Sequence, residues 1–205
     1  MEVRTQPVGP WPMNTYVLVD PTSGQSVLID PGAEPTTLRQ LLAGTTPLAI
    51  LITHTHPDHI AALDEMRGEL GIPVLAHPEA RAAKPDRTLN GGDTFAVGQH
   101  TLHVYHTPGH SADMLTFLTG DDANGYTAIV GDTIFDGGPG RTWSAADFQT
   151  TLHTLRDMVL LWPDATTCHP GHGPAFKLGE RRAAIEAFVQ HEHGNFWGDA
   201  TWDRV

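Results

Sequence analysis

Short apolar runs rich in β-branched residues alternate with polar turns along this chain, and the pattern predicts a protein with many strands. Residues 20–24 form a turn signal between two such runs, so we expect a hairpin there. Residues 78–93 carry no such run and are expected to form a loop. The predicted strands are 15–19, 26–29, 48–52, 72–76, 94–97, 101–106, 115–118, 126–130 and 164–168, with 94–97/101–106 and 115–118/126–130 as further pairs.

Apolar residues three and four positions apart predict four helices. Ser144, with Asp147 three residues later, has the spacing of a helix N-cap. Groups of strands followed by helices occur twice, and no linker or low-complexity segment separates them. We therefore expect one domain over residues 1–205, an α/β protein of αββα sandwich type in which two packed mixed sheets are flanked by helices. The helices are predicted at 36–42, 58–70, from 144 to about 159, and 179–191.

Polar residues able to bind metal follow the ends of several predicted strands. His54 and His56 come directly after strand 48–52, and alternation along an extended chain places them on the same side. Imidazoles and carboxylates are ligands that zinc-type ions accept. The chain has 13 histidines, which raises the expectation of a metal site. The candidate ligands are His54, His56, Asp58, His59, His110, Asp132 and His172.

These seven residues are enough for two incomplete coordination spheres. We expect His54, His56 and His110 on one ion, Asp58, His59 and His172 on the other, and Asp132 as the bridge. Each sphere would keep an open position, as catalytic sites do. The predicted cofactor is a pair of divalent metal ions, with zinc, iron and manganese all open. Two ions about 3.5–4 Å apart can share a hydroxide and polarise a carbonyl or phosphoryl oxygen.

Four motifs in order resemble the metallo-β-lactamase superfamily: H-x-H-x-D-H at 54–59, T-P-G-H at 107–110, G-D-T at 131–133 and P-G-H-G at 170–173. The resemblance implies the αββα fold and the seven residues as metal ligands. Asp132 in place of Cys is similar to the glyoxalase II-like, lactonase and nuclease branches. His56 stands where the diiron flavoproteins tend to carry Glu. The run around Gly140-Arg141-Thr142 resembles short glyoxalase II-like hydrolases and persulfide dioxygenases, with Trp143 where Asp is usual there.

The resemblance implies hydrolysis of a thioester, such as an S-acylglutathione or related acyl-thiol, by a metal-bridging hydroxide. Asp58 and Asp132 are the predicted catalytic carboxylates, and a thiolate leaves without a strong acid because its pKa is about 8.5. Arg141, beside a glycine-rich loop, is expected to bind a substrate carboxylate. About thirty residues follow His172, whereas glyoxalase II has a helical region there that binds glutathione, so glutathione dependence stays open. The alternatives are a mononuclear iron persulfide dioxygenase, a lactone or phosphoester hydrolase, and a non-catalytic metal-binding relative.

Charge and composition narrow the partners. The formal net charge is −12, which disfavours nucleic acid and anionic membrane surfaces. No apolar run has the roughly 20 residues of a membrane span, and residues 1–7 carry no secretory signal. The single cysteine, Cys168, fits a reducing cytosol. We expect a cytoplasmic enzyme, monomer or homodimer, acting on a small acyl substrate. The aromatic segment 196–202 is expected either to dock on its own domain or to form a subunit contact.

Overall fold

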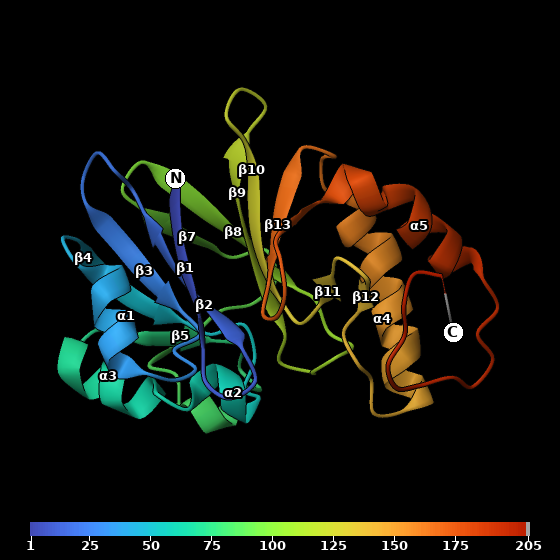
Figure 1. Ribbon diagram of the computed structural model, residues 1–205, viewed down its shortest axis with the longest axis horizontal. Helices are drawn as coiled ribbons and strands as arrows, with labels where there is room; N and C mark the ends of the chain where they lie inside the picture. Colours follow the sequence, from blue (N-terminus) through green and yellow to red (C-terminus); the bar gives the residue numbers. More distant parts are fainter. Residues whose placement is uncertain (204–205) are drawn as a thin grey trace.

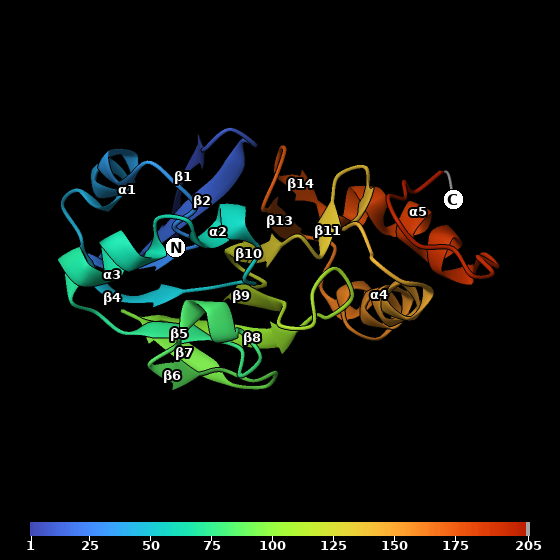
Figure 2. The ribbon, with the colours of Figure 1, turned by 90° about the horizontal axis from the view of Figure 1, so that it is seen from below.

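Two six-stranded sheets stack on one another in the computed structural model, which describes residues 1–203 (Figures 1 and 2). Both sheets mix parallel and antiparallel pairs: β2 is antiparallel to β3, β3 is parallel to β4, and β10 is parallel to β13. The first sheet has the order β1 (Glu2–Val8), β2 (Met13–Val19), β3 (Gln25–Ile29), β4 (Thr46–Leu51), β5 (Val74–Ala76) and β6 (Arg87–Thr88). The second has the order β14 (Phe176–Lys177), β13 (Thr166–Pro170), β10 (Gly125–Gly131), β9 (Leu115–Asp121), β8 (His100–His106) and β7 (Thr94–Val97).

Helices cover the outer faces of both sheets. On the first sheet lie α1 (Pro35–Leu42), α2 (Pro57–Ile60) and α3 (Leu63–Leu70), and on the second lie α4 (Ala145–Asp157) and α5 (Leu178–Gln190) (Figure 1). A small hairpin of β11 (Ile134–Phe135) and β12 (Gly138–Pro139) follows β10. The predicted αββα sandwich is confirmed. No helix within residues 1–203 is long and apolar enough to cross a membrane.

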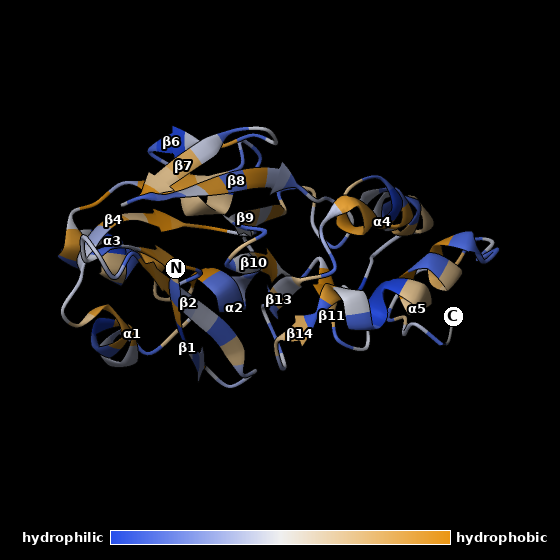
Figure 3. Ribbon diagram, turned by 90° about the horizontal axis from the view of Figure 1, so that it is seen from above, coloured by the Kyte–Doolittle hydropathy of each residue, from blue (hydrophilic) through white to orange (hydrophobic). Residues whose placement is uncertain are grey.

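Alternation along the strands explains how one sheet serves two cores. In β2, Val17 and Val19 pack toward the helices, while Tyr16 and Leu18 face the second sheet. In β10, Ile129 belongs to the core between the sheets, and its neighbours pack under α4 and α5. Strands buried on both faces have nearly continuous apolar sequences, and most strands in Figure 3 are accordingly coloured as hydrophobic. The apolar runs in the sequence were therefore reliable predictors of the inner strands.

The structure corrects the prediction in three places. The helix expected over 58–70 is two helices, because the Ala62 N–H donates to the Pro31 carbonyl oxygen (2.9 Å) and interrupts the helical course. Strand β1 was not predicted, since its side chains are mostly exposed and polar. The expected loop 78–93 contains a short 3-10 turn at Arg81–Ala83 and the edge strand β6. The three hairpins predicted from the sequence are all present.

Candidate metal centre

The structure brings all seven predicted ligands together. Ligand atoms of His54, His56 and His110 lie within 4.8 Å of one another, and those of Asp58, His59 and His172 form a second such group. Within the groups, His110 Nε2 is 2.9 Å from His56 Nδ1, and His172 Nε2 is 3.1 Å from Asp58 Oδ2. The groups are the same as those expected from the sequence.

Asp132 lies between the two groups. Its Oδ1 is 3.5 Å from His59 Nε2, and its Oδ2 is 3.5 Å from His110 Nε2 and 3.8 Å from His172 Nε2. The carboxylate is 9% exposed and therefore held away from bulk water. Oδ2 lies between nitrogens of both groups and Oδ1 faces the second group, so the carboxylate is placed to contact an ion in either group, as a bridging ligand requires.

Loops at the ends of strands deliver these side chains. Strand β4 ends at Leu51, and Pro57 begins α2, so the segment carrying His54 and His56 is short and extended. Gly171, just after β13, lets the loop carrying His172 approach the centre closely. A Cβ atom at Gly171 would lie 2.1 Å from Asp132 Oδ1 and 2.6 Å from His59 Cε1. No side chain fits there, so the close approach requires glycine.

Hydrogen bonds to Nδ1 orient four of the five histidine rings. His59 Nδ1 donates to Asp30 Oδ2 (2.9 Å), and His54 Nδ1 donates to Thr53 Oγ1 (3.1 Å). His110 Nδ1 donates to the Arg141 carbonyl oxygen (2.8 Å), and His172 Nδ1 donates to that of Pro12 (3.1 Å). With its proton on Nδ1, each ring presents the Nε2 lone pair to the centre, as metal-binding imidazoles do. His56 is the exception, because its Nδ1 faces the centre.

Asp30 is a residue of this site that the sequence reasoning missed. Its carboxylate accepts hydrogen bonds from the Thr53 N–H (2.7 Å) and Thr53 Oγ1 (2.5 Å) as well as from His59. Asp30 also lies within 4.8 Å of ligand atoms of His54 and His59, but both of its oxygens are already engaged. We assign it to orienting the rings rather than to binding an ion. Asp113 acts similarly on the loop, accepting from Thr55 N–H (3.0 Å) and Thr55 Oγ1 (2.7 Å).

Three buried polar atoms at the centre have no hydrogen-bond partner in residues 1–203: His54 Nε2, His59 Nε2 and Asp132 Oδ1. Leaving such atoms unpaired costs free energy, so native proteins rarely do so without a reason. All three atoms are electron-pair donors aimed at the same space. A divalent cation of zinc type would satisfy them, and the donor set therefore fits the expected metal ions.

Burial and neighbouring charges shift the pKa values of the histidines in ways that fit a bound cation. Burial lowers the pKa of His54 well below its ordinary value, and the neighbouring imidazoles lower it further. Burial likewise lowers the pKa of His56 and of His110, so these rings are neutral and able to donate lone pairs. For His59, burial lowers the pKa, but the carboxylates of Asp132 and Asp30 outweigh it and raise the pKa to about 10. The metal-free His59 ring therefore holds a proton on Nε2 between these carboxylates, and a bound cation would take the place of that proton.

Arg141, the predicted substrate-binding residue, lies outside both ligand groups. Its guanidinium stacks over the Trp143 ring at 4.9 Å, and Nη1 forms an ion pair with Asp199 at 3.0 Å. Trp143 is 54% exposed and lies edge-on to the His56 ring, with 6.3 Å between ring centroids. Arg141 and Trp143 thus extend from the centre toward solvent.

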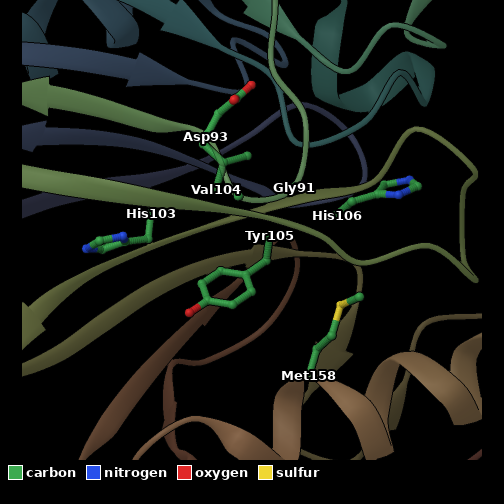
Figure 4. A pocket seen from close by; sticks show the side chains of 8 residues that line it. Gly91, Asp93, His103, Val104, Tyr105, His106 and Met158 are labelled. Atoms are coloured by element: carbon green, nitrogen blue, oxygen red, sulfur yellow. The ribbon is translucent and has the colours of Figure 1, made fainter.

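Two cavities differ in their relation to this centre. One of about 200 Å³ shares Asp58 with it and is otherwise lined by apolar residues and the exposed Trp11. The other, of about 360 Å³, is shown in Figure 4 and contains no candidate ligand. Tyr105 and Met158 line the second cavity, together with Gly91, Gly92, Asp93, His103, Val104 and His106.

Comparisons with known proteins agree with this fold. The family description "Metallo-beta-lactamase superfamily" matches residues 8–172. A probable metallo-hydrolase, YqgX of Bacillus subtilis, is 36% identical over 85% of this chain and 91% of its own. A hydroxyacylglutathione hydrolase of Rhizobium etli is 35% identical over 87% of this chain and 69% of its own.

Solved structures give the same result. ETHE1 from Myxococcus xanthus is 27% identical, with a TM-score of 0.81 over 94% of this chain and 86% of that one. TTHA1623 in a di-iron-bound form is 32% identical, with a TM-score of 0.72 over 88% of this chain and 96% of that one. Fold and site together define an enzyme of the metallo-hydrolase class. The chain belongs to the metallo-beta-lactamase superfamily.

Proposed function

We propose that this enzyme hydrolyses thioesters of small acyl compounds with two divalent metal ions. The observation that supports this most is Asp132, whose carboxylate contacts His110 of one ligand group and both His59 and His172 of the other. Similarity to the Rhizobium etli hydroxyacylglutathione hydrolase supports a thioester substrate. Similarity to a protein solved in a di-iron-bound form supports two ions.

The residues divide the work in this proposal. His54, His56 and His110 hold one ion, Asp58, His59 and His172 hold the other, and Asp132 binds both. Bound ions of this kind would act as Lewis acids, which would lower the pKa of a coordinated water and polarise a carbonyl oxygen. Asp58, which is 24% exposed beside His172, also orients the attacking water through its second oxygen. A thiolate product leaves without protonation because its pKa is about 8.5.

Arg141 supplies the proposed contact to a substrate carboxylate. Its guanidinium is 47% exposed, and its stacking on Trp143 holds it on the solvent side of His56. A planar guanidinium binds carboxylates through two parallel hydrogen bonds. We propose a small, carboxylate-bearing acyl-thiol as the substrate, with S-acylglutathiones as the first compounds to assay.

The test is metal analysis combined with a substrate panel. Purified protein is assayed for metal per chain and for turnover of S-lactoylglutathione, a simple acyl thioester, a lactone, a phosphoester and glutathione persulfide. We expect two ions per chain and turnover of thioesters above all other compounds. Two ions with preferred turnover of the lactone or phosphoester would contradict the thioester assignment and keep the dinuclear hydrolase.

A mononuclear iron persulfide dioxygenase is the second candidate. It is favoured by the resemblance of the run around Gly140-Arg141-Thr142 to persulfide dioxygenases. The unequal burial of the two ligand groups also favours it, since Asp58 and His172 have side chains 24% and 31% exposed. Such exposed ligands compete with water and hold an ion less tightly. One iron per chain, with oxygen consumed in the presence of a persulfide, would establish this alternative and contradict the hydrolase.

Location and assembly stay proposals. We propose a reducing compartment such as the cytosol, supported by the single cysteine, which is buried. We propose a monomer or homodimer without a nucleic-acid or membrane partner, supported by the net charge of −12.

A further inference from the structure

The C-terminal segment 196–203, which we call the strap, lies along the loop of residues 136–143. Trp202 donates from its backbone N–H to the Gly137 carbonyl oxygen (3.0 Å) and from Nε1 to that of Asp136 (2.9 Å). The Thr142 N–H donates to the Gly198 carbonyl oxygen (3.1 Å), and the Gly198 N–H donates to Thr142 Oγ1 (3.2 Å). The strap therefore holds the loop at both of its ends.

Aromatic side chains anchor the strap on the helical layer. The Trp202 ring is edge-on to Phe188 of α5 at 5.5 Å, and the Phe196 ring is edge-on to Phe148 of α4 at 4.9 Å. Phe148 and Phe188 are buried, so these contacts extend the core under α4 and α5. Of the two predicted roles of this segment, docking on its own domain is the one seen.

The opposite face of the loop touches the metal centre. A Cβ atom at Gly140 would lie 1.9 Å from the Asp132 carbonyl oxygen and 2.9 Å from His110 Cβ, so the backbone is in direct contact with both ligands. The carbonyl oxygen of Arg141 also accepts the hydrogen bond that orients His110. The loop thus lies between the strap and the ligands, with the Arg141 side chain at its solvent edge.

Asp199 of the strap gives Arg141 a carboxylate partner from within the chain. One pair of atoms makes the contact, Nη1 and Oδ2 at 3.0 Å, and the two side chains are 47% and 77% exposed. An exposed pair with a single contact contributes little net stability. A ligand carboxylate that binds the guanidinium with two hydrogen bonds has the better geometry. Asp199 is therefore placed to exchange with such a ligand at small cost.

We propose that the strap is part of the substrate site and that Asp199 occupies Arg141 until the carboxylate of an acyl-thiol substrate displaces it. This inference rests on the proposed thioester hydrolysis and deepens it by naming the residue that competes with the substrate carboxylate for Arg141. Stacking on Trp143 keeps the guanidinium in place during the exchange, because cation–π contact holds one of its faces. Asp199 is a specificity-determining residue in this proposal and takes no part in the chemistry.

The test compares two thioesters that differ only in a carboxylate and its neutral amide. The measured quantity is the ratio of KM for the amide to KM for the carboxylate, in the full chain loaded with metal. We expect Asp199→Asn to raise this ratio about two- to fivefold, the effect of removing one exposed ionic competitor. We expect Arg141→Gln to lower it at least about tenfold, as loss of a charge-assisted pair does. Asp157→Asn is the matched control, because Asp157 forms an exposed pair with Arg156 on α4.

A binding measurement separates this inference from the proposed reaction. Calorimetric titration with a non-hydrolysable carboxylate thioether and with its amide needs no turnover. If thioesters are not hydrolysed but the thioether affinities follow the expected pattern, the inference holds and the proposed function fails. If Asp199→Asn leaves both ratios unchanged, or weakens both ligands equally, Asp199 is only an anchor of the strap and the inference is wrong.

Discussion

The two ligand groups are similar in composition and different in surroundings. His54 is 0% exposed and His110 is 9% exposed, and their group lies against the loop of residues 136–143. In the other group, His59 is 0% exposed, whereas the side chains of Asp58 and His172 are 24% and 31% exposed. The first group therefore lies mostly in the protein interior, whereas the second group, with the same kinds of ligand atom, lies near solvent.

This difference in burial predicts a difference in affinity between the two metal sites. Buried nitrogens that lack a partner gain most from an ion, because no water replaces it when it leaves. Exposed ligands exchange with water and are held by fewer neighbours. His54 is oriented through Thr53 and Asp30, while His172 is oriented by one backbone carbonyl at 3.1 Å. We expect the buried group to bind its ion more tightly.

The largest effect is expected from Asp132→Ala, which removes the residue common to both groups. Activity should fall by more than about 100-fold. Loss of a residue that only hydrogen-bonds to a metal ligand costs less, about 10- to 100-fold. Metal per chain, measured by elemental analysis after dialysis, should fall for both ions. Asp122→Asn, on the exposed β9–β10 turn, is the control. Retention of both ions in Asp132→Ala would show that the two groups are independent.

Asp30→Asn and Thr53→Val change residues that bind no ion themselves, and comparing them distinguishes how each ligand group is oriented. Asp30 orients His59 directly and His54 through Thr53, whereas the Thr53 hydroxyl contacts the His54 ring and donates to Asp30. We expect Asp30→Asn to weaken binding of both ions by about 10- to 100-fold, and Thr53→Val to weaken only the ion of the buried group. Competition with a chromogenic chelator measures both affinities. Equal effects of the two variants on both ions would contradict the view that His54 and His59 are oriented by different hydrogen bonds.

Sequence patterns predicted the inner strands well and named seven side chains that the fold brings together, for physical reasons. Strands such as β4 are apolar throughout because both faces are buried, and metal ligands are recognisable by residue type at strand ends. The role of Asp30 was not predictable, since an orienting carboxylate is defined only by the ring that lies beside it. The break between α2 and α3 also depends on a tertiary hydrogen bond to Pro31. The contact of Arg141 with Asp199 joins residues 58 positions apart, and no local signal marks it.

A smaller difference is expected between His54→Ala and His172→Ala. Removing the buried His54 ring takes away an ion ligand at a place that water does not reach, which costs about 1–3 kcal/mol, whereas water replaces the exposed His172 ring. We therefore expect His54→Ala to lose at least about tenfold more affinity for its ion than His172→Ala. Isothermal titration with zinc after chelator treatment measures both. If His172→Ala loses as much zinc affinity as His54→Ala, exposure does not determine the difference in affinity between the two sites.

The smallest effect on the metal centre concerns His169, a histidine outside both ligand groups that contacts Tyr16 edge-on. Burial lowers its pKa to about 4, so the folded protein keeps the ring neutral while the unfolded chain binds a proton below the ordinary value of 6.5. Stability should therefore be complete well above pH 6.5 and fall by up to about 3 kcal/mol as the pH drops toward 4, since each pKa unit is worth about 1.4 kcal/mol. His169→Asn should remove this part of the pH dependence, measured as the urea midpoint of metal-free protein from pH 7 to 4. His153→Asn, at an exposed position of α4, should retain it. An unchanged slope in His169→Asn would show that the acid sensitivity comes from the ligand histidines alone.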